Sequence, residues 1–412
     1  MLIADIARIQ ADIGQLKSIS EPCEAGTTRI GFTPMYRRGV DYFKRRMSET
    51  GLYVREDGIG NIYGRLEGTE NGLPVILSGS HLDTVRCAGA YDGIAGTVCA
   101  LEAARMLIEN GISLRHSYEV IGTIEEEGSR FGQVLIGSQF ITGVFGDKEL
   151  DALSDPDGTT LREILKAYLP ADTCPAYRQD DEILAFLELH DEQGPVLETE
   201  NIDIGIVESI VAISWLTVTV TGFAGHAGTV PMPLRQDAAT GACRLIDNIA
   251  RHTAEHYAYR ATATVGKLEL LPGSPNCIPS KCIFTVDLRS GKMSDIDELA
   301  AFIRKLAEEV ERQCNVEIQI NMDFRQESIA MDEKLRGLLK KSCERLGFHN
   351  KYINSGAGHD AMVFSARWPT AMLFVPCAKG ITHNPAEYVS PEALVKGTNV
   401  LYQTILCLDS EL

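Results

Sequence analysis

Histidine and aspartate side chains that suit metal chemistry follow a short apolar run near the start of the chain, in LPVILSGSHLDTVRCAGAYDGIAG. His81 offers a neutral ring nitrogen to a divalent ion, and Asp83 could hold the other ring nitrogen and so fix the tautomer. Asp92 has two oxygens on a short side chain and could bridge two cations about 3.5–4 Å apart, as two-metal hydrolases require. Alone, a His-x-Asp pair is more often a surface histidine beside a solvated aspartate, so the prediction depends on further ligands.

Three adjacent glutamates follow a second strand-like run, HSYEVIGTI, at Glu125, Glu126 and Glu127. A metal-bound water needs a carboxylate that accepts its proton without holding the metal, so neighbouring glutamates with separate roles make chemical sense. The alternative is a solvated acidic loop. Spacing alone does not say which glutamate has which role.

Two more histidines occupy equivalent places in the chain. The run ILAFLEL delivers His190, with Gln193 close behind, and the run AMLFVPC leads to His383. Four strand-like runs therefore end in candidate ligands, which predicts that these residues meet at the carboxyl edge of one sheet. Because every candidate ligand offers nitrogen or oxygen, the set suits Zn, Mn, Ni or Co rather than a thiolate site.

Two further histidines lie in glycine-containing loops. His226 lies in GFAGHAGTVPMPLRQDA, where glycines and prolines enforce a tight loop, and His359 lies in SGAGHDA. For each of them a structural role and a catalytic role are equally open.

Charge and cysteine content narrow the class of protein. The chain has 412 residues, with 39 basic and 57 acidic side chains and a formal charge of −18, which repels phosphate backbones and anionic lipid surfaces. We therefore expect no nucleic acid or membrane partner.

Eleven cysteines without a CxxC pair argue against a disulfide framework or a zinc ribbon and favour a reducing cytoplasm. The N-terminal stretch is interrupted by charged residues, as in an amphipathic helix rather than a signal peptide.

The elements that position the candidate ligands predict an α/β domain. Apolar strand-like runs alternate with helical patterns, such as the one from Asp92 to Asn110, which favours a mixed, mostly parallel sheet. The segment 145–181 is rich in turn residues and is expected to cross the surface, with one helix around 160–168.

The segment 212–324 has a different order of elements. A half-buried strand and a long helical pattern precede the strands ATATVGKLELL and KCIFTVDLRS, a helix capped by Ser294 and the strand VEIQINMDF. This βαββαβ order is typical of a ferredoxin-like α+β unit. We expect residues 1–210 and 327–412 to form the catalytic domain and residues 211–326 to form an inserted domain.

At these residues the sequence resembles a known family. The segments that carry the likeness are GSHLDTV, AGAYDG, EEEGSRF, ELHDEQGPVLE, GHAGTVPM, DLRS, SGAGHDA and GITHNPAE. In this order they are similar to the hydantoinase/carbamoylase family of dinuclear metal amidohydrolases, over most of the chain. The resemblance implies a metallopeptidase-like catalytic domain and an inserted domain that acts as a lid and forms a homodimer.

The resemblance also implies a role for each matching residue. Two divalent ions per subunit (Zn, Mn, Co or Ni) would be held by His81 and His190 on one side, by Glu127 and His383 on the other, and by Asp92 between them. Glu126 would be the general base and His226 would stabilise the oxyanion, while Asp83 would support His81. Residues expected to bind substrate are Gln193, Asn276, Arg289, Gly358 and His359.

Arg289 ends a predicted strand, one position beyond an apolar residue. A guanidinium there could pair bidentately with a carboxylate, and the alternative is an exposed salt-bridging arginine. The resemblance favours substrate binding.

The reaction implied by the resemblance is cleavage of the ureido C–N bond of an N-carbamoyl-L-amino acid, a small carboxylate-bearing substrate. Allantoate is the alternative substrate, and a metal-dependent exopeptidase is a third possibility. A non-catalytic metal protein would be favoured only if the base were missing. One departure stands beside a ligand: family members usually carry an apolar residue where this chain has Asp191, which could strengthen metal binding or face solvent.

Overall fold

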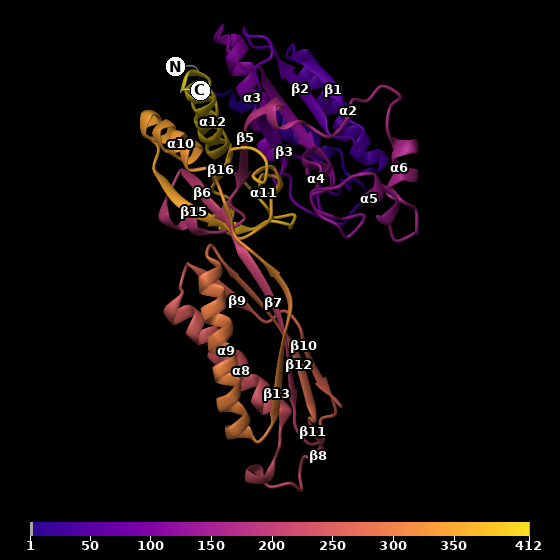
Figure 1. The fold of residues 1–412 in the computed structure, drawn as a ribbon, viewed down its shortest axis with the longest axis vertical. Helices are drawn as coiled ribbons and strands as arrows, with labels where there is room; N and C mark the ends of the chain where they lie inside the picture. The colour runs from indigo at the N-terminus through magenta and orange to yellow at the C-terminus, as the bar shows by residue number, and fades with distance from the viewer. Residues whose placement is uncertain (1–2, 412) are drawn as a thin grey trace. The chain divides into compact units, whose positions relative to one another are not determined.

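The computed structural model describes residues 3–411, which divide into two compact units (Figure 1). The first unit contains the residues up to Glu208, Ala330–Ile353 and the residues from Ala357 onward. The second contains Ser209–Ile329 and Asn354–Gly356. Because each unit has its own hydrophobic core, each can be described by itself.

A nine-stranded sheet is the centre of the first unit. Its order is β1-β2-β4-β3-β5-β16-β6-β14, with β15 beside β6. The strands are β1 (Tyr53–Glu56), β2 (Ile62–Leu66), β3 (Val75–His81), β4 (Tyr118–Thr123), β5 (Ile183–Asp191), β6 (Ile204–Ile210), β14 (Ile329–Ala330), β15 (Asn350–Ser355) and β16 (Thr370–Val375). Strands β4, β3, β5 and β16 are neighbours and run parallel. These are the four strands predicted to end in candidate ligands, and the expected mixed α/β sheet is confirmed.

Helices cover both faces of these central strands. Leu187 of β5 belongs to the main core with residues of α3 and α12. Its neighbour Phe186 points to the opposite face and stacks on Phe364 of α11, with ring centroids 4.2 Å apart. Strands buried on both sides read as continuous apolar runs, which is the pattern seen in the sequence.

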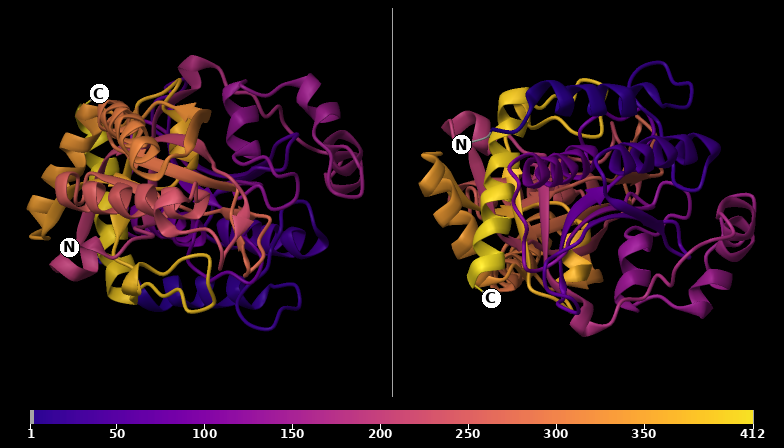
Figure 2. Two further views of the ribbon diagram at one scale, coloured as in Figure 1. Left: turned by 90° about the horizontal axis from the view of Figure 1, so that it is seen from below. Right: turned by 90° about the horizontal axis from the view of Figure 1, so that it is seen from above.

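The helices of the first unit come from both ends of the chain. They are α1 (Ile6–Ser18), α2 (Pro34–Glu49), α3 (Ile94–Glu109), α4 (Ile136–Thr142), α5 (Asp147–Ala152), α6 (Leu161–Tyr168), α7 (Val196–Glu200), α10 (Glu333–Leu346), α11 (Asp360–Phe364) and α12 (Pro391–Glu411). Helix α1 contacts both α3 and α12, and Figure 2 shows α12 in yellow near the indigo N-terminal helices. No helix within residues 3–411 has the length and apolar character needed to cross a membrane.

The second unit is an antiparallel sheet with two helices. Its strands are β7 (Ala212–Thr221), β9 (Ala261–Thr264), β10 (Leu268–Leu271), β12 (Lys281–Ser290) and β13 (Glu317–Gln326), and its helices are α8 (Ala238–His256) and α9 (Met293–Cys314). The sheet order is β10-β12-β7-β13, with β9 also paired to β12. Alternate residues of β7 and β12 are buried against the helices, as the period of two in their sequences predicts.

Two details of this unit differ from the sequence prediction. The stretch ATATVGKLELL is not one strand but forms β9 and β10, which both pair with β12. Helix α9 begins at Met293, so Ser294 lies inside its first turn and does not cap it. The reason is local: the Ser290 hydroxyl accepts the Lys292 N–H and donates to Asp295, which orders the turn before the helix.

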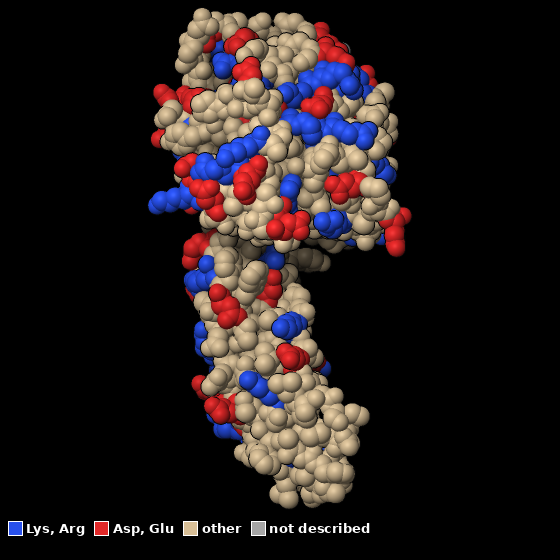
Figure 3. All heavy atoms as spheres, turned by 90° about the vertical axis from the view of Figure 1, so that its right-hand side faces the viewer, with Lys and Arg blue, Asp and Glu red and all other residues tan. Residues whose placement is uncertain are grey.

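One end of the second unit exposes apolar side chains. A short ribbon of β8 (Gly225–His226) and β11 (Cys277–Ile278) lies there, and Figure 3 shows few charged side chains over this end. Phe223, Met232 and Leu234 in the same segment are each at least 70% exposed. Large exposed apolar side chains gathered in one segment mark a candidate interaction surface.

Candidate metal centre

Asp92 lies at the middle of the candidate centre. Its Oδ1 atom is 3.3 Å from Nε2 of His81 and 3.2 Å from Nε2 of His190, whereas its Oδ2 atom is 3.1 Å from Nε2 of His383. Nε2 of His383 is also 3.3 Å from Glu127. The ligand atoms thus form two compact sets, His81–Asp92–His190 and Asp92–Glu127–His383, which share Asp92.

Four of these five side chains lie at or after the end of a central strand. His81 is the last residue of β3 and His190 the last but one of β5, while Glu127 and His383 follow β4 and β16. Asp92 stands just before α3, where Gly93 has a φ of +67° and a Cβ would come within 2.5 Å of the His81 ring. Glycine is therefore required at this close approach.

The ring of His81 is oriented by the main chain of Asp83. Nδ1 lies 3.1 Å from the Asp83 carbonyl oxygen but 3.8 Å from its carboxylate. The contact between Asp83 and the second ring nitrogen is made by the main chain, because the carboxylate accepts the N–H groups of Glu126 and Glu127 at 3.2 Å each. A proton on Nδ1 leaves Nε2 as the metal-binding nitrogen, so the tautomer expected from the sequence is retained.

His190 is oriented in the same way by the residue that follows it. Nδ1 lies 3.0 Å from the Asp191 carbonyl oxygen, which again directs Nε2 toward Asp92. Burial alone would raise the pKa of Asp92, but hydrogen bonds with His190, His383 and His81 outweigh it and hold that pKa well below its ordinary value. Asp92 is therefore an anionic candidate ligand shared by the two sets.

The residues fit metal ions. Glu127 Oε1 is buried and has no hydrogen bond partner among residues 3–411, although Oε2 of the same side chain faces His383. A buried carboxylate oxygen without a partner, on a side chain that contacts a histidine, is available as a donor atom for a metal ion. The imidazole and carboxylate donors suit Zn, Mn, Co or Ni, so both sets are compatible with metal binding.

The three adjacent glutamates point in different directions. Glu125 turns away, and its Oε1 accepts the backbone N–H of Arg130 at 2.6 Å. Glu126 stays beside the ligands, with Oε2 3.9 Å from Nε2 of His81, but belongs to neither ligand set. Burial, opposed by His81, raises the pKa of Glu126 well above its ordinary value. A carboxylate next to a metal set but outside it has the position of a proton acceptor.

Left-handed backbone conformations gather at the centre. Glu125, Gln193 and His383 have φ of +54°, +56° and +53°, values that residues other than glycine rarely adopt. Such conformations persist only where the surrounding structure enforces them, and they cluster at functional sites. Two of these residues, Gln193 and His383, contact Asp92 directly.

Two residues that the sequence reasoning missed support Asp92. The Glu387 carboxylate, buried at 5% exposure, accepts the N–H of Tyr91 at 2.9 Å and lies 3.4 Å from the N–H of Asp92. The Thr382 hydroxyl lies 2.9 Å from both Asp92 Oδ2 and Glu387 Oε1. Both belong to the GITHNPAE segment that carries His383, so their place in this motif was the available signal.

Predicted substrate residues of the first unit lie close to the ligands. Gln193 donates from Nε2 to Asp92 Oδ2 at 2.9 Å, and its Oε1 is buried without a hydrogen bond partner in the described part of the chain. His359 is buried with its ring centroid 4.6 Å from that of His190, and burial lowers its pKa well below the ordinary value. Gly358 precedes it in the loop before α11.

The remaining predicted residues belong to the second unit. His226 lies in β8, and the Asn276 carbonyl accepts the N–H of the next residue, Ala227, at 3.0 Å. His226 and Asn276 are thus on adjacent segments. Arg289 donates to both oxygens of Asp287 at 3.0 Å each and to the Gly356 carbonyl at 2.7 Å.

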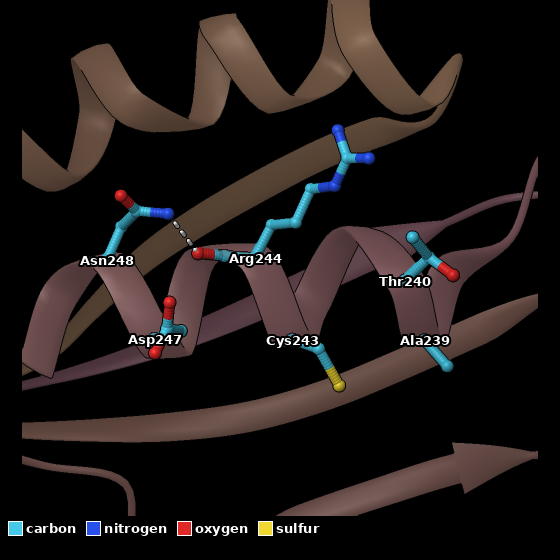
Figure 4. A pocket seen from close by; sticks show the side chains of 6 residues that line it. All are labelled: Ala239, Thr240, Cys243, Arg244, Asp247 and Asn248. Atoms are coloured by element: carbon cyan, nitrogen blue, oxygen red, sulfur yellow. Dashed lines mark hydrogen bonds between the residues drawn. The ribbon is translucent and has the colours of Figure 1, made fainter.

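The second unit also has an open hollow on α8, of about 410 Å³. Figure 4 shows its six lining residues along the helix, with the Asn248 side chain donating to the Arg244 carbonyl. None of the predicted site residues lines it. The hollow therefore adds no residue to the candidate centre.

Comparison with known proteins gives consistent similarities. The sequence profile of peptidase family M20/M25/M40 matches residues 77–406. An N-carbamoyl-L-amino-acid amidohydrolase of Paenarthrobacter aurescens is 40% identical over 408 residues, 98% of each chain. An allantoate amidohydrolase of Escherichia coli K12 is 37% identical over 401 residues, 95% of each chain. The solved structure of a hydantoinase/carbamoylase family amidase from Burkholderia ambifaria has a TM-score of 0.93 at 34% identity and covers 99% of this chain and 98% of its own.

Proposed function

Because the chain belongs to peptidase family M20/M25/M40, with hydantoinase/carbamoylase amidases as full-length relatives, we propose that it is a metal-dependent amidohydrolase of N-carbamoyl-L-amino acids. The reaction adds water at the ureido carbon and breaks its bond to the amino acid nitrogen, which releases the amino acid and carbamate. The carbamate then decomposes to ammonia and carbon dioxide as its remaining C–N bond breaks. One observation carries this proposal: two candidate ligand sets share Asp92, and Glu126 lies beside them without belonging to either set.

The proposed centre holds two divalent ions per subunit, chosen from Zn, Mn, Co and Ni. His81 and His190 would hold one, Glu127 and His383 the other, and Asp92 both. When bound, such ions lower the pKa of water to about 7 and polarise the scissile carbonyl. A chelator should therefore abolish activity and one of these ions should restore it, whereas full activity in metal-free protein would reject the centre.

Glu126 is proposed to move the proton. Its carboxylate would take a proton from the attacking water and deliver it to the leaving amino acid nitrogen, which is the work of a general base that becomes a general acid. Its position supports this role, because its backbone is held by Asp83 and its side chain is outside both ligand sets. Asp83 thereby acts on the reaction by positioning Glu126.

The substrate would be held mainly through its carboxylate and its ureido group. We assign the carboxylate to Arg289, with Asn276 as a further partner, and the ureido group to Gln193, Gly358 and His359. His226 would stabilise the oxyanion that develops on the ureido oxygen. The unit that carries Arg289, Asn276 and His226 would act as a lid.

The lid unit is also the proposed surface of a homodimer. Phe223, Met232 and Leu234 support this, because they are exposed in the single chain. Large apolar side chains gathered in one exposed segment usually pack against a partner protein. Light scattering should give a dimer that Leu234→Asp weakens. A wild-type monomer at working concentration would reject the dimer.

Location and other partners complete the proposal. All eleven cysteines are free thiols, which supports a reducing compartment such as the cytoplasm. The formal charge of −18 supports a small-molecule substrate without nucleic acid or membrane partners.

Allantoate is the second candidate substrate, favoured by the allantoate amidohydrolase among the relatives. A panel of N-carbamoyl-L-amino acids, β-ureidopropionate, allantoate and dipeptides, assayed for ammonia and amino acid release, decides the substrate class. The proposal expects the highest kcat/KM with an N-carbamoyl-L-amino acid. Dipeptide cleavage without ammonia release from any ureido compound would make the protein an exopeptidase.

A further inference from the structure

Asp191 is a buried carboxylate beside a histidine of the candidate metal centre. It follows His190 in β5, and its side chain is completely buried, so it does not face solvent. Its Oδ1 lies 3.3 Å from Nδ1 of His190. The N–H at Nδ1 points to the Asp191 carbonyl at 3.0 Å, and neither carboxylate oxygen has a good hydrogen bond within residues 3–411. The carboxylate therefore lies next to the ring without a hydrogen bond partner among these residues.

A buried carboxylate without hydrogen bonds is unfavourable unless a positive charge lies close by. A divalent ion on Nε2 of His190 would supply such a charge through the ring. In return, a carboxylate on the Nδ1 side increases the basicity of a metal-binding imidazole. The same interaction that relieves the buried charge would strengthen ion binding.

The second histidine of this ligand set lacks an equivalent charge. The Asp83 carboxylate is 3.8 Å from Nδ1 of His81, and it accepts the N–H groups of Glu126 and Glu127. Its charge is already balanced by those groups. The two histidines thus share a backbone contact at Nδ1, but among the described residues only the carboxylate beside His190 has no N–H partner.

We propose that Asp191 is a positioning residue that strengthens the binding of the ion held by His190, through the charge of its carboxylate. The inference rests on the proposed metal centre. It adds that the two ions are bound unequally, because Asp191 acts on the ion of the His81–His190 side and not on that of the Glu127–His383 side.

The test is a zinc titration of metal-stripped protein against a chromophoric chelator, which measures a Kd for each ion without any activity assay. Asp191→Asn keeps the shape and removes the charge, and Asp191→Leu removes both charge and oxygens. The control is Asp181→Asn, an exposed aspartate whose loss changes the net charge equally. Circular dichroism and the melting midpoint of each stripped protein report whether the fold is intact.

In both Asp191 variants we expect one ion to bind about 10–100-fold more weakly, the other ion to keep its Kd, and Asp181→Asn to match wild type. Two unchanged Kd values in Asp191→Asn would overturn the inference, as would weakening in Asp191→Leu alone, which assigns the effect to packing. If Asp191→Leu does not fold, Asp191→Asn decides. A wild-type protein that binds no zinc would instead reject the metal centre itself.

Discussion

His81 and Asp83 are linked through the main chain: Nδ1 of the histidine lies 3.1 Å from the aspartate carbonyl, while the aspartate carboxylate is 3.8 Å from the ring. That carboxylate instead accepts the N–H groups of Glu126 and Glu127. One residue therefore sets the tautomer of a candidate ligand with its backbone and holds the turn after β4 with its side chain. A substitution of the Asp83 side chain should change its contacts with Glu126 and Glu127 and leave the backbone contact to His81 in place.

Asp83→Asn should lower kcat more than metal content. The amide retains one acceptor oxygen and directs an NH2 group at a backbone N–H, so the turn that carries Glu126 shifts, and a misplacement of about 1 Å costs about 10²-fold in rate. The backbone contact to His81 remains. Steady-state kinetics and metal analysis of the same preparation test this, and wild-type kcat would show that the carboxylate does not position Glu126.

Glu126→Gln and Glu127→Gln should have opposite signatures. Glu126→Gln is expected to retain its metal and lose about 10²–10⁴-fold in rate, because it removes only the proton acceptor. Glu127→Gln should lose one ion, since it belongs to a ligand set. If Glu126→Gln is the variant that loses metal and Glu127→Gln keeps it, the two roles are exchanged.

Arg289→Lys should raise KM or lower kcat/KM substantially, because an ammonium group does not reproduce the planar fork that pairs with a carboxylate. The matched control is Arg325→Lys, which changes another arginine of the same unit that also pairs with an aspartate, Asp297. Kinetics with the best substrate of the panel compare the two variants. Equal effects would remove Arg289 from the substrate site.

Because of Glu119, the free energy of unfolding should fall as the pH is lowered into the acid range. It is fully buried with Arg178 at 3.0 Å and Arg55 at 3.2 Å. Burial alone would raise its pKa, but the arginines outweigh burial and hold that pKa below the ordinary value of 4.5. Because the folded pKa is below the unfolded one, this stabilisation is present above the unfolded pKa and disappears as the pH falls through the folded pKa.

Glu119→Gln should therefore destabilise the protein by about 3–5 kcal/mol at pH 7, since it removes a buried carboxylate that pairs with both Arg178 and Arg55. The difference from wild type should shrink as the pH falls below 4.5. Glu67→Gln is the control, because Glu67 forms an exposed pair with Arg65, worth about 0–1 kcal/mol. Thermal unfolding followed across pH measures both variants, and a pH-independent difference would contradict the assignment.

The sequence predicted that the candidate ligands meet at one edge of the sheet, because each apolar run is followed by histidine or carboxylate side chains that can bind metal ions. The strands that deliver His81, His190 and His383 are neighbours in the sheet, and the family resemblance is confirmed by the comparisons. Continuous apolar runs carry this information because both faces of the strands are covered.

Contacts between distant segments were not predictable in the same way. Glu387 and Thr382 support Asp92 from almost 300 residues away along the chain, and no periodicity links them. The choice between main chain and side chain at Asp83 depends on the turn of Glu126, which is a tertiary feature. The start of α9 before Ser294 shows the same limit, because Ser290 and Asp295 order the turn that precedes it.

The place of β16 between β5 and β6 has a consequence for biosynthesis. Residues 370–375 are made after both of their neighbours in the sheet and after the whole second unit. Until they leave the ribosome, the inner edge of β5 has unpaired backbone groups of the kind that recruit other chains. We therefore expect the nascent chain to be prone to aggregation until β16 pairs with β5. The same strand also brings in His383, so the candidate ligand set Asp92–Glu127–His383 is complete only after β16 has been made.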